Sequence, residues 1–111
     1  MEEALTLSYH GGTLIASLGG EIDHHRAVSV RTKIDEALFT FMPQTLVIDI
    51  GRVDFMDSSG LGLIMGRYSL MQKLGGTLTL RRPNERIVKI FELANLGRMI
   101  RIEADGEEEA K

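Results

Sequence analysis

The stretch Phe55-Met56-Asp57-Ser58-Ser59-Gly60-Leu61-Gly62 decides the fold, because an apolar strand gives way to a helix within it. Before it, the β-branched run Leu46-Val47-Ile48-Asp49-Ile50 is typical of a strand that is buried on both faces. After it, apolar residues recur at helical spacing, at Leu61, Ile64, Met65, Tyr68 and Met71. A buried strand that leads into an amphipathic helix indicates an α/β protein with a parallel sheet.

The turn between this strand and this helix suits two different roles for its serines. Ser58 or Ser59 is predicted to cap the helix, because a hydroxyl there accepts a hydrogen bond from a free N–H group of the first turn. The turn also lies at the carboxyl end of a strand, where ligands and partners usually bind. A phosphate on a serine there would face a helix N-terminus, whose dipole favours negative charge. Gly60 and Gly62 leave the first turn without side-chain bulk, so another protein can approach the backbone.

A second segment, Gly20-Glu21-Ile22-Asp23-His24-His25, also leads into a helix, and the two segments together resemble the STAS domain family of anti-sigma factor antagonists. The resemblance runs from about residue 5 to 102 and is strongest to the sporulation branch in spore-forming bacteria. It implies a cytoplasmic, non-enzymatic switch that binds an anti-sigma factor serine kinase and so releases a sigma factor. It further implies that the kinase phosphorylates the serine after the motif's aspartate, here Ser58, and that a serine phosphatase reverses this.

We hypothesise that both segments form one surface that docks the kinase, because both are helix starts that contain glycine and aspartate. The predicted residues of this surface are Gly20, Glu21, Asp23, His24 and His25 from the first segment, and Met56, Asp57, Ser58, Ser59, Gly60, Leu61 and Gly62 from the second. Asp23 has two interpretations, one as the cap of the first helix and one as a polar contact to a basic residue of the partner. Helix periodicity assigns Leu61 to the core and leaves Leu63 open as a contact.

The other elements follow from alternating apolar residues and from turn residues. Strands are predicted at about 5–9, 13–18, 46–50, 77–80 and 99–102, and the central helix at about 59–74. Inner faces are predicted at Ala27, Val30, Ile34, Leu38 and Phe41 for the first helix, and at Ile87, Ile90, Phe91 and Ala94 for the third. Gly19-Gly20 is expected to end the second strand, and Asn84 to cap the third helix.

The order β-β-α-β-α-β-α-β predicts a single small α/β domain with a mostly parallel sheet, opened by an N-terminal β-hairpin and with helices packed on the sheet. Residues 1–103 are assigned to the domain. The acidic segment 104–111 has almost no apolar anchors and is predicted to be a frayed tail. Relatives usually continue into a further helix there, so the chain departs from the family at this end.

Composition excludes several functional classes. The chain has 111 residues, of which 43% are hydrophobic, and this suffices for one core. Its formal net charge of -3, without a prominent basic patch, argues against nucleic acid as the main partner. The absence of cysteine excludes disulfides and thiolate metal sites. No apolar run reaches membrane-spanning length, so we expect a soluble cytoplasmic protein without a membrane partner.

Enzyme motifs find little support in the sequence. The segment from Gly60 to Gly66 has one residue too many for a dinucleotide-binding fingerprint, and no Walker lysine follows a glycine-rich run. Ser58 does not lie in a Gly-x-Ser-x-Gly motif, and this argues against a hydrolase catalytic triad. His24-His25 with Asp23 lacks a third or fourth metal ligand. We therefore predict no catalytic residue, no metal and no cofactor.

Three alternatives remain open. Asp49, near the end of a buried strand, sits where a receiver-like domain carries its aspartyl phosphate, although only Asp54 and Asp57 are candidate Mg²⁺ ligands beside it. Other STAS domains bind a small apolar ligand or scaffold a larger signalling or transport complex, and the phosphorylatable motif argues against that role. The general stress branch often has threonine in place of Ser59, so the Ser-Ser pair and the double histidine favour the sporulation branch.

Overall fold

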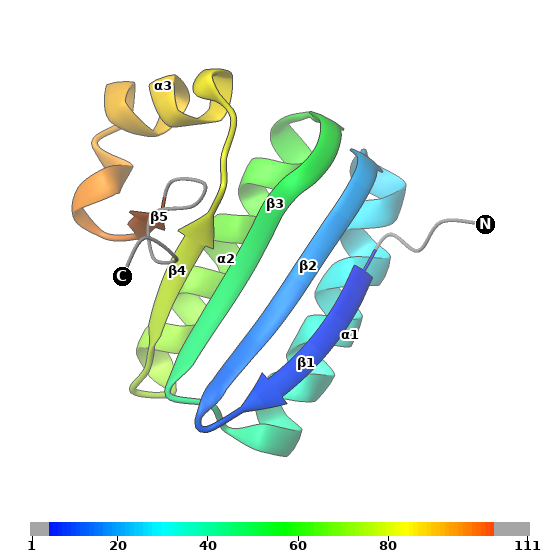
Figure 1. Ribbon diagram of the computed structural model, residues 1–111, viewed down its shortest axis with the longest axis vertical. Helices are drawn as coiled ribbons and strands as arrows, with labels where there is room; N and C mark the ends of the chain where they lie inside the picture. Colours follow the sequence, from blue (N-terminus) through cyan, green and yellow to red (C-terminus); the bar gives the residue numbers. More distant parts are fainter. Residues whose placement is uncertain (1–4, 104–111) are drawn as a thin grey trace.

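The elements of a computed structural model of the protein follow the predicted order β-β-α-β-α-β-α-β (Figure 1). The structure describes residues 5–103, so the predicted acidic tail at 104–111 lies outside the described residues. The elements are β1 (Leu5–His10), β2 (Thr13–Ile22), α1 (His24–Phe41), β3 (Thr45–Met56), α2 (Ser58–Lys73), β4 (Thr77–Arg81), α3 (Glu85–Leu93), the 3-10 turn η1 (Leu96–Arg98) and β5 (Arg101–Glu103).

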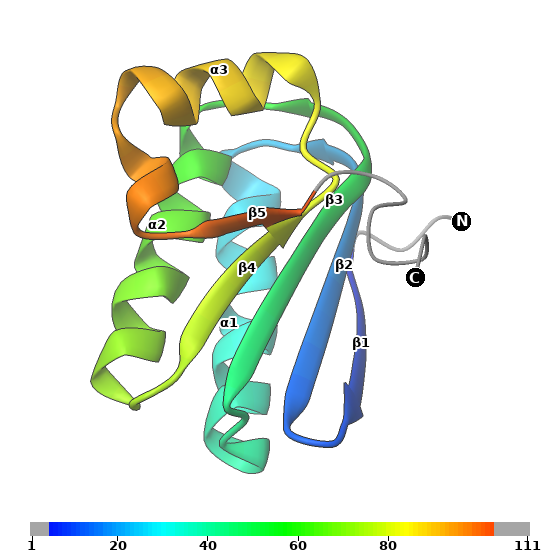
Figure 2. The same cartoon turned by 60° about the vertical axis from the view of Figure 1, so that its left-hand side comes forward.

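The strands form one mostly parallel five-stranded sheet, in the order β1-β2-β3-β4-β5. β1 and β2 pair in the antiparallel direction, and their hairpin turns at Gly11 and Gly12, whose φ angles of 53° and 87° suit glycine. The other three pairs are parallel, as the helical crossovers require. Figure 2 shows α1 and α2 on one face of the sheet, with α3 beyond the carboxyl ends of β3 and β4.

The core lies between the sheet and these two helices. Alternate residues of the central strands point into it, and the register places Ala16 beside Ile48 and Ile48 beside Leu80. The most completely buried side chains are Phe91, Leu14, Leu18, Ile22, Ile34, Leu38, Leu46, Ile48, Ile64, Met71, Leu80 and Ile100. Burial of these apolar side chains supplies the main driving force for folding.

The strands that lead to the two sequence motifs are longer than the sequence predicted. The prediction that Gly19-Gly20 ends the second strand is wrong, because β2 continues to Ile22. Its pairing with β3 shifts register around Gly20, whose φ of 74° favours glycine, and then resumes with Ile22 opposite Met56. β3 likewise extends beyond residue 50, to Met56. Both strands therefore deliver their motifs to the same end of the sheet.

The predicted helix faces are partly wrong. Leu63, left open as a contact, is buried in the core, whereas Leu61 is only partly buried. The cause is that α2 packs on α1 as well as on the sheet, so its buried face reaches from Gly60 through Leu63 to Arg67. Phe41 is exposed and stacks on Tyr9, with ring centroids 4.6 Å apart. At the end of α3, Ala94 is also exposed.

Candidate phosphorylation and partner-binding surface

The starts of α1 and α2 lie side by side at one end of the sheet. Ile22 ends β2 directly opposite Met56, which ends β3. The next residue, Asp57, donates its backbone N–H to the carbonyl oxygen of Ile22 at 3.4 Å. Across the same junction, Ser59 Oγ lies 3.5 Å from His24 Nδ1. We call residues 20–25 and 56–62 the paired helix starts, because this geometry joins the two motifs that the sequence placed far apart.

An aspartate caps each of the two helices. Asp23 Oδ1 accepts a hydrogen bond from the N–H of Arg26 at 2.9 Å, which confirms its predicted role as a cap. Asp57 Oδ1 accepts from the N–H of Ser59 at 2.8 Å. The prediction that Ser58 or Ser59 caps α2 is therefore wrong. The extended backbone of Asp57 places its carboxylate at the cap, so neither serine hydroxyl has to serve there.

Ser58 is the first residue of α2 and is exposed. Its side chain is therefore at the N-terminus of the helix. Ser59 differs, because it is half-buried and touches His24. Of the two adjacent serines, Ser58 is the one that another protein can reach without moving a neighbouring side chain.

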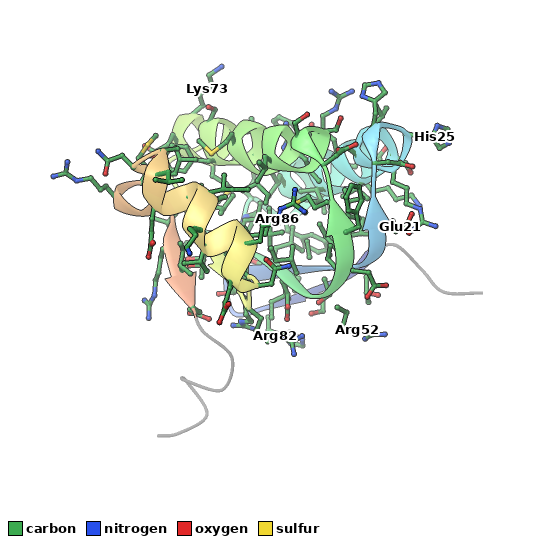
Figure 3. The ribbon with its side chains drawn as sticks, turned by 90° about the horizontal axis from the view of Figure 1, so that it is seen from above. Glu21, His25, Arg52, Lys73, Arg82 and Arg86 are labelled. Atoms are coloured by element: carbon green, nitrogen blue, oxygen red, sulfur yellow. The ribbon has the colours of Figure 1, made fainter. Side chains whose placement is uncertain are left out.

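The carboxylate of Asp23 favours its ionised form. The hydrogen bond from the N–H of Arg26 lowers its pKa below the ordinary value, and the nearby charges of His25 and Arg26 act in the same direction. Glu21 and His25 are exposed around it, and Figure 3 places His25 at the outer edge of the α1 start. The paired helix starts therefore present a negative charge at Asp23 and an exposed serine at position 58.

Two residues predicted for the surface support it from below. Met56 is 7% exposed, and Gly60 is buried against it. A Cβ atom added at Gly60 would lie 2.2 Å from Met56 Cγ and 2.8 Å from its sulfur atom, so any larger residue would force the Met56 side chain to move. Leu61 is partly buried, and Gly62 is exposed. Met56 and Gly60 therefore offer no side chain to a partner, and the exposed residues of the paired helix starts are the ones that can contact it.

Sequence reasoning missed Arg26 and Arg67. Arg26 follows the first motif, and its Nη1 donates to the carbonyl oxygen of Glu21 at 3.5 Å. Arg67 is only 8% exposed, although it is charged. Its position on the same helical face as Ile64 and Met71 is a signal that could have found it, since a charged residue inside an apolar stripe is uncommon.

The receiver-like alternative for Asp49 does not fit the structure. Asp49 lies within β3 rather than near its end, and it is 7% exposed. Its two carboxylate oxygens each accept a hydrogen bond from Arg82 at 3.1 Å, and Oδ1 also accepts from the N–H of Gly51 at 2.9 Å. Within residues 5–103, no group of three or more His, Asp or Glu side chains is arranged to hold a metal ion. Asp49 is therefore a structural ion-pair partner.

Comparison with known proteins identifies the family. The sequence profile of the STAS domain matches residues 4–109. The chain belongs to the STAS domain family. This STAS domain is 34% identical over 102 residues to the anti-sigma F factor antagonist of Paenibacillus polymyxa, covering 92% of this chain and 87% of that protein. It is also 30% identical over 96 residues to the intermembrane phospholipid transport system binding protein MlaB of Escherichia coli K12, covering 86% of this chain and 93% of MlaB.

Solved structures agree with the fold of this STAS domain. The unphosphorylated form of the anti-sigma factor antagonist SpoIIAA superposes with a TM-score of 0.79 at 32% identity, covering 96% of this chain and 94% of that one. The phosphorylated form of Bacillus SpoIIAA gives a TM-score of 0.77 at 34% identity, covering 96% of both chains. No helix within residues 5–103 has the length and apolarity needed to cross a membrane.

Proposed function

We propose that this STAS domain is an anti-sigma factor antagonist that is switched by phosphorylation of Ser58. In its unphosphorylated form it binds an anti-sigma factor serine kinase through the paired helix starts, and the bound sigma factor is released. The observation that carries the proposal is the exposed Ser58 hydroxyl at the start of α2, held beside the start of α1 by the contact between Asp57 and Ile22. Similarity to proteins named as anti-sigma factor antagonists supports the same role.

The kinase inactivates the domain in this scheme. The Ser58 hydroxyl attacks the γ-phosphorus of ATP, the bond to the ADP oxygen breaks, and the hydroxyl proton is released. A serine phosphatase hydrolyses the phosphoserine and restores binding. The domain itself carries out no reaction, so the proposal assigns it neither catalytic residues nor a cofactor. That SpoIIAA, a relative of the same fold, has been solved in a phosphorylated form supports a phosphorylated state of this domain.

A cytoplasmic role in sporulation is the finer form of the proposal. It is supported by the Ser58-Ser59 pair and by His24-His25, which resemble the sporulation branch of the family. The partner is then the anti-sigma factor kinase of that branch, and neither nucleic acid nor a membrane takes part directly.

A second candidate function is a scaffold or ligand-binding subunit of a transport complex. The observation that favours it is the similarity to MlaB, which extends over most of both chains. The two functions differ in what Ser58 does. A scaffold of this kind would bind its complex whether or not ATP and a serine kinase are present, whereas the proposed switch would be released by them.

Replacing Asp23 by Asn tests whether its charge contributes to partner binding. Asn retains a side-chain oxygen that caps α1 but removes the negative charge. We expect an approximately tenfold loss of affinity for the cognate anti-sigma factor kinase, because a fixed anion opposite a basic residue of the partner would be lost. Isothermal titration calorimetry would measure the affinity, and the thermal transition of the variant should stay close to that of the wild type.

The control for this test is Asp54→Asn, which removes a charge from an exposed residue of β3 outside the paired helix starts. It should bind the kinase as well as the wild type does. Unchanged affinity in Asp23→Asn would mean that Asp23 serves only as a cap. If the wild-type chain formed no complex with the kinase, the proposed function itself would be wrong.

A further inference from the structure

A groove of about 270 Å³ runs between α1 and α2, next to the paired helix starts. Its lining residues are His24, Ala27, Val28 and Arg31 from α1, and Ser59, Gly62, Leu63, Gly66 and Arg67 from α2. His24 and Ser59 belong both to this groove and to the paired helix starts, where they touch each other. The groove is therefore continuous with the surface that carries Ser58, and a protein bound there can also enter it.

Two glycines keep the groove open. Gly62 and Gly66 are one helical turn apart and lie on the same face of α2. A Cβ atom added at either position would meet no other atom within 4 Å. Neither glycine is needed for close packing inside the domain, in contrast to Gly60. Glycine in the interior of a helix is less favourable than alanine. These two glycines therefore weaken α2, and no packing contact inside the domain requires them.

The cationic residues of the groove are two arginines, of which Arg67 is already paired with Asp35 inside the domain. His24, Arg31 and Arg67 line the groove, and none of the described lining residues is acidic. Arg67 is 8% exposed, and its Nε lies 2.9 Å from Asp35 Oδ1. That contact lacks the geometry of a hydrogen bond, so within the described chain neither of these buried atoms has a hydrogen-bond partner. Burial lowers the pKa of Arg67, Asp35 opposes this shift, and the neighbouring charge of Arg31 adds to it.

A carboxylate that entered the groove would face the guanidinium groups of Arg31 and Arg67, whereas Asp35 Oδ1, itself an acceptor, would gain nothing from it. An arginine that is removed from water and poorly hydrogen-bonded is costly, and an oxygen anion offers the planar, two-pronged acceptor that its guanidinium prefers. The absence of side chains at Gly62 and Gly66 lets the backbone of a partner come close enough for a short acidic side chain to reach Arg67.

We propose that this groove is a binding subsite for an aspartate or glutamate side chain of the anti-sigma factor. The inference rests on the proposed function and adds the chemistry of the partner: an acidic residue, on a segment whose backbone lies against Gly62 and Gly66. Partner binding would then use opposite charges at two adjacent places, with Asp23 facing a basic residue and Arg31 with Arg67 facing an acidic one. This arrangement fixes the orientation of the partner over Ser58.

Filling the groove is the first test. Gly66→Leu places a side chain in the open space, and we expect the affinity for the cognate anti-sigma factor to fall at least tenfold in calorimetric titration. Because an added Cβ atom meets open space and leucine favours the helix more than glycine does, we expect the melting temperature to stay close to that of the wild type. The matched control is Gly97→Leu, because a Cβ atom added at Gly97 would also meet open space, whereas Gly97 lies in η1, outside the groove. This control should bind normally.

Reversing the charge is the second test. Arg31→Glu should weaken binding at least tenfold and reduce the dependence of affinity on salt concentration. Lys33→Glu makes the same change at an exposed residue of α1 that does not line the groove, and it should alter affinity less than threefold. The first test changes the volume of the groove and the second changes its charge. If one of the two variants folds poorly, the other still tests the inference.

The results separate this inference from the proposed function. If the wild type binds the anti-sigma factor and phosphorylation of Ser58 weakens the complex, while Gly66→Leu and Arg31→Glu bind normally, the groove inference is wrong and the proposed function stands. If Gly66→Leu weakens binding but Arg31→Glu does not, the groove contacts the partner without an acidic residue, and the inference is again overturned. If the wild type does not bind, both proposals fail.

Discussion

Phosphorylation of Ser58 is expected to weaken binding to the anti-sigma factor by about 100- to 1000-fold, which corresponds to about 3–4 kcal/mol. The phosphate adds a charge of about -1.5 to -2 at an exposed position beside the Asp57 carboxylate. At about 5 Å and an effective dielectric constant near 20, two unit charges interact by about 3 kcal/mol before salt screening. The α2 dipole offsets only part of this repulsion, by at most about 2 kcal/mol.

Steric exclusion acts in the same direction. A serine hydroxyl that is buried against a partner leaves no room for a solvated phosphate, so the volume and the hydration of the phosphate oppose the complex, whereas its repulsion by Asp57 is present in the free domain as well. Affinities would be measured by titrating the anti-sigma factor with protein carrying phosphoserine at position 58. Phosphoserine at Ser69, an exposed residue further along α2, is the matched control and should bind like the unmodified chain. Equal loss of affinity at both positions would mean that the effect is not specific to Ser58.

Gly60→Val is expected to lower the free energy of unfolding by about 2–3 kcal/mol more than Gly62→Val does. Both changes put the same β-branched residue into the first turns of α2, so their cost in helix propensity is similar. Only at position 60 does the new side chain collide with Met56, whose Cγ would lie 2.2 Å from the added Cβ. Urea unfolding followed by circular dichroism would measure the difference.

A double substitution tests the physical cause. Met56→Ala removes the atoms that collide, so Gly60→Val should cost less in the Met56→Ala background than in the wild type. An equal cost in both backgrounds would place the strain elsewhere. Because Gly60 and Met56 are the buried members of the paired helix starts, loss of their packing should also weaken partner binding. Affinities should therefore be compared only among variants that are fully folded.

Much of the fold was predictable because local patterns and tertiary packing agree. Alternating residues such as Leu14, Ala16 and Leu18 identified β2, and helical spacing identified α1 through Val30 and Ile34, all of which are buried. Asp23 and Asn84 were correctly predicted as caps, since each is a good acceptor just before an apolar helical pattern. In these elements every local preference supports the same structure.

Features that depend on pairing between distant segments were not predictable. The Gly19-Gly20 pair is typical of the end of a strand. In the structure, however, residues after Gly20 still pair with β3, so β2 continues to Ile22. Asp57, Ser58 and Ser59 are all favourable N-cap residues, so N-cap propensity does not distinguish among them. Asp57 is the N-cap because β3 ends at Met56, the residue before it. The groove depends on how α1 packs on α2, and the only local sign of it is that Arg67 interrupts the apolar stripe of α2.

Mapping the phosphate tests the central claim most directly. The purified chain would be incubated with ATP and the cognate anti-sigma factor kinase, and the products analysed by mass spectrometry for the wild type and for Ser58→Ala. We predict a single phosphate on Ser58, its absence in Ser58→Ala, and weaker binding of the modified wild type to the kinase. Absence of phosphate from the wild type, or phosphate on another residue with Ser58 unmodified, would contradict the proposed switch.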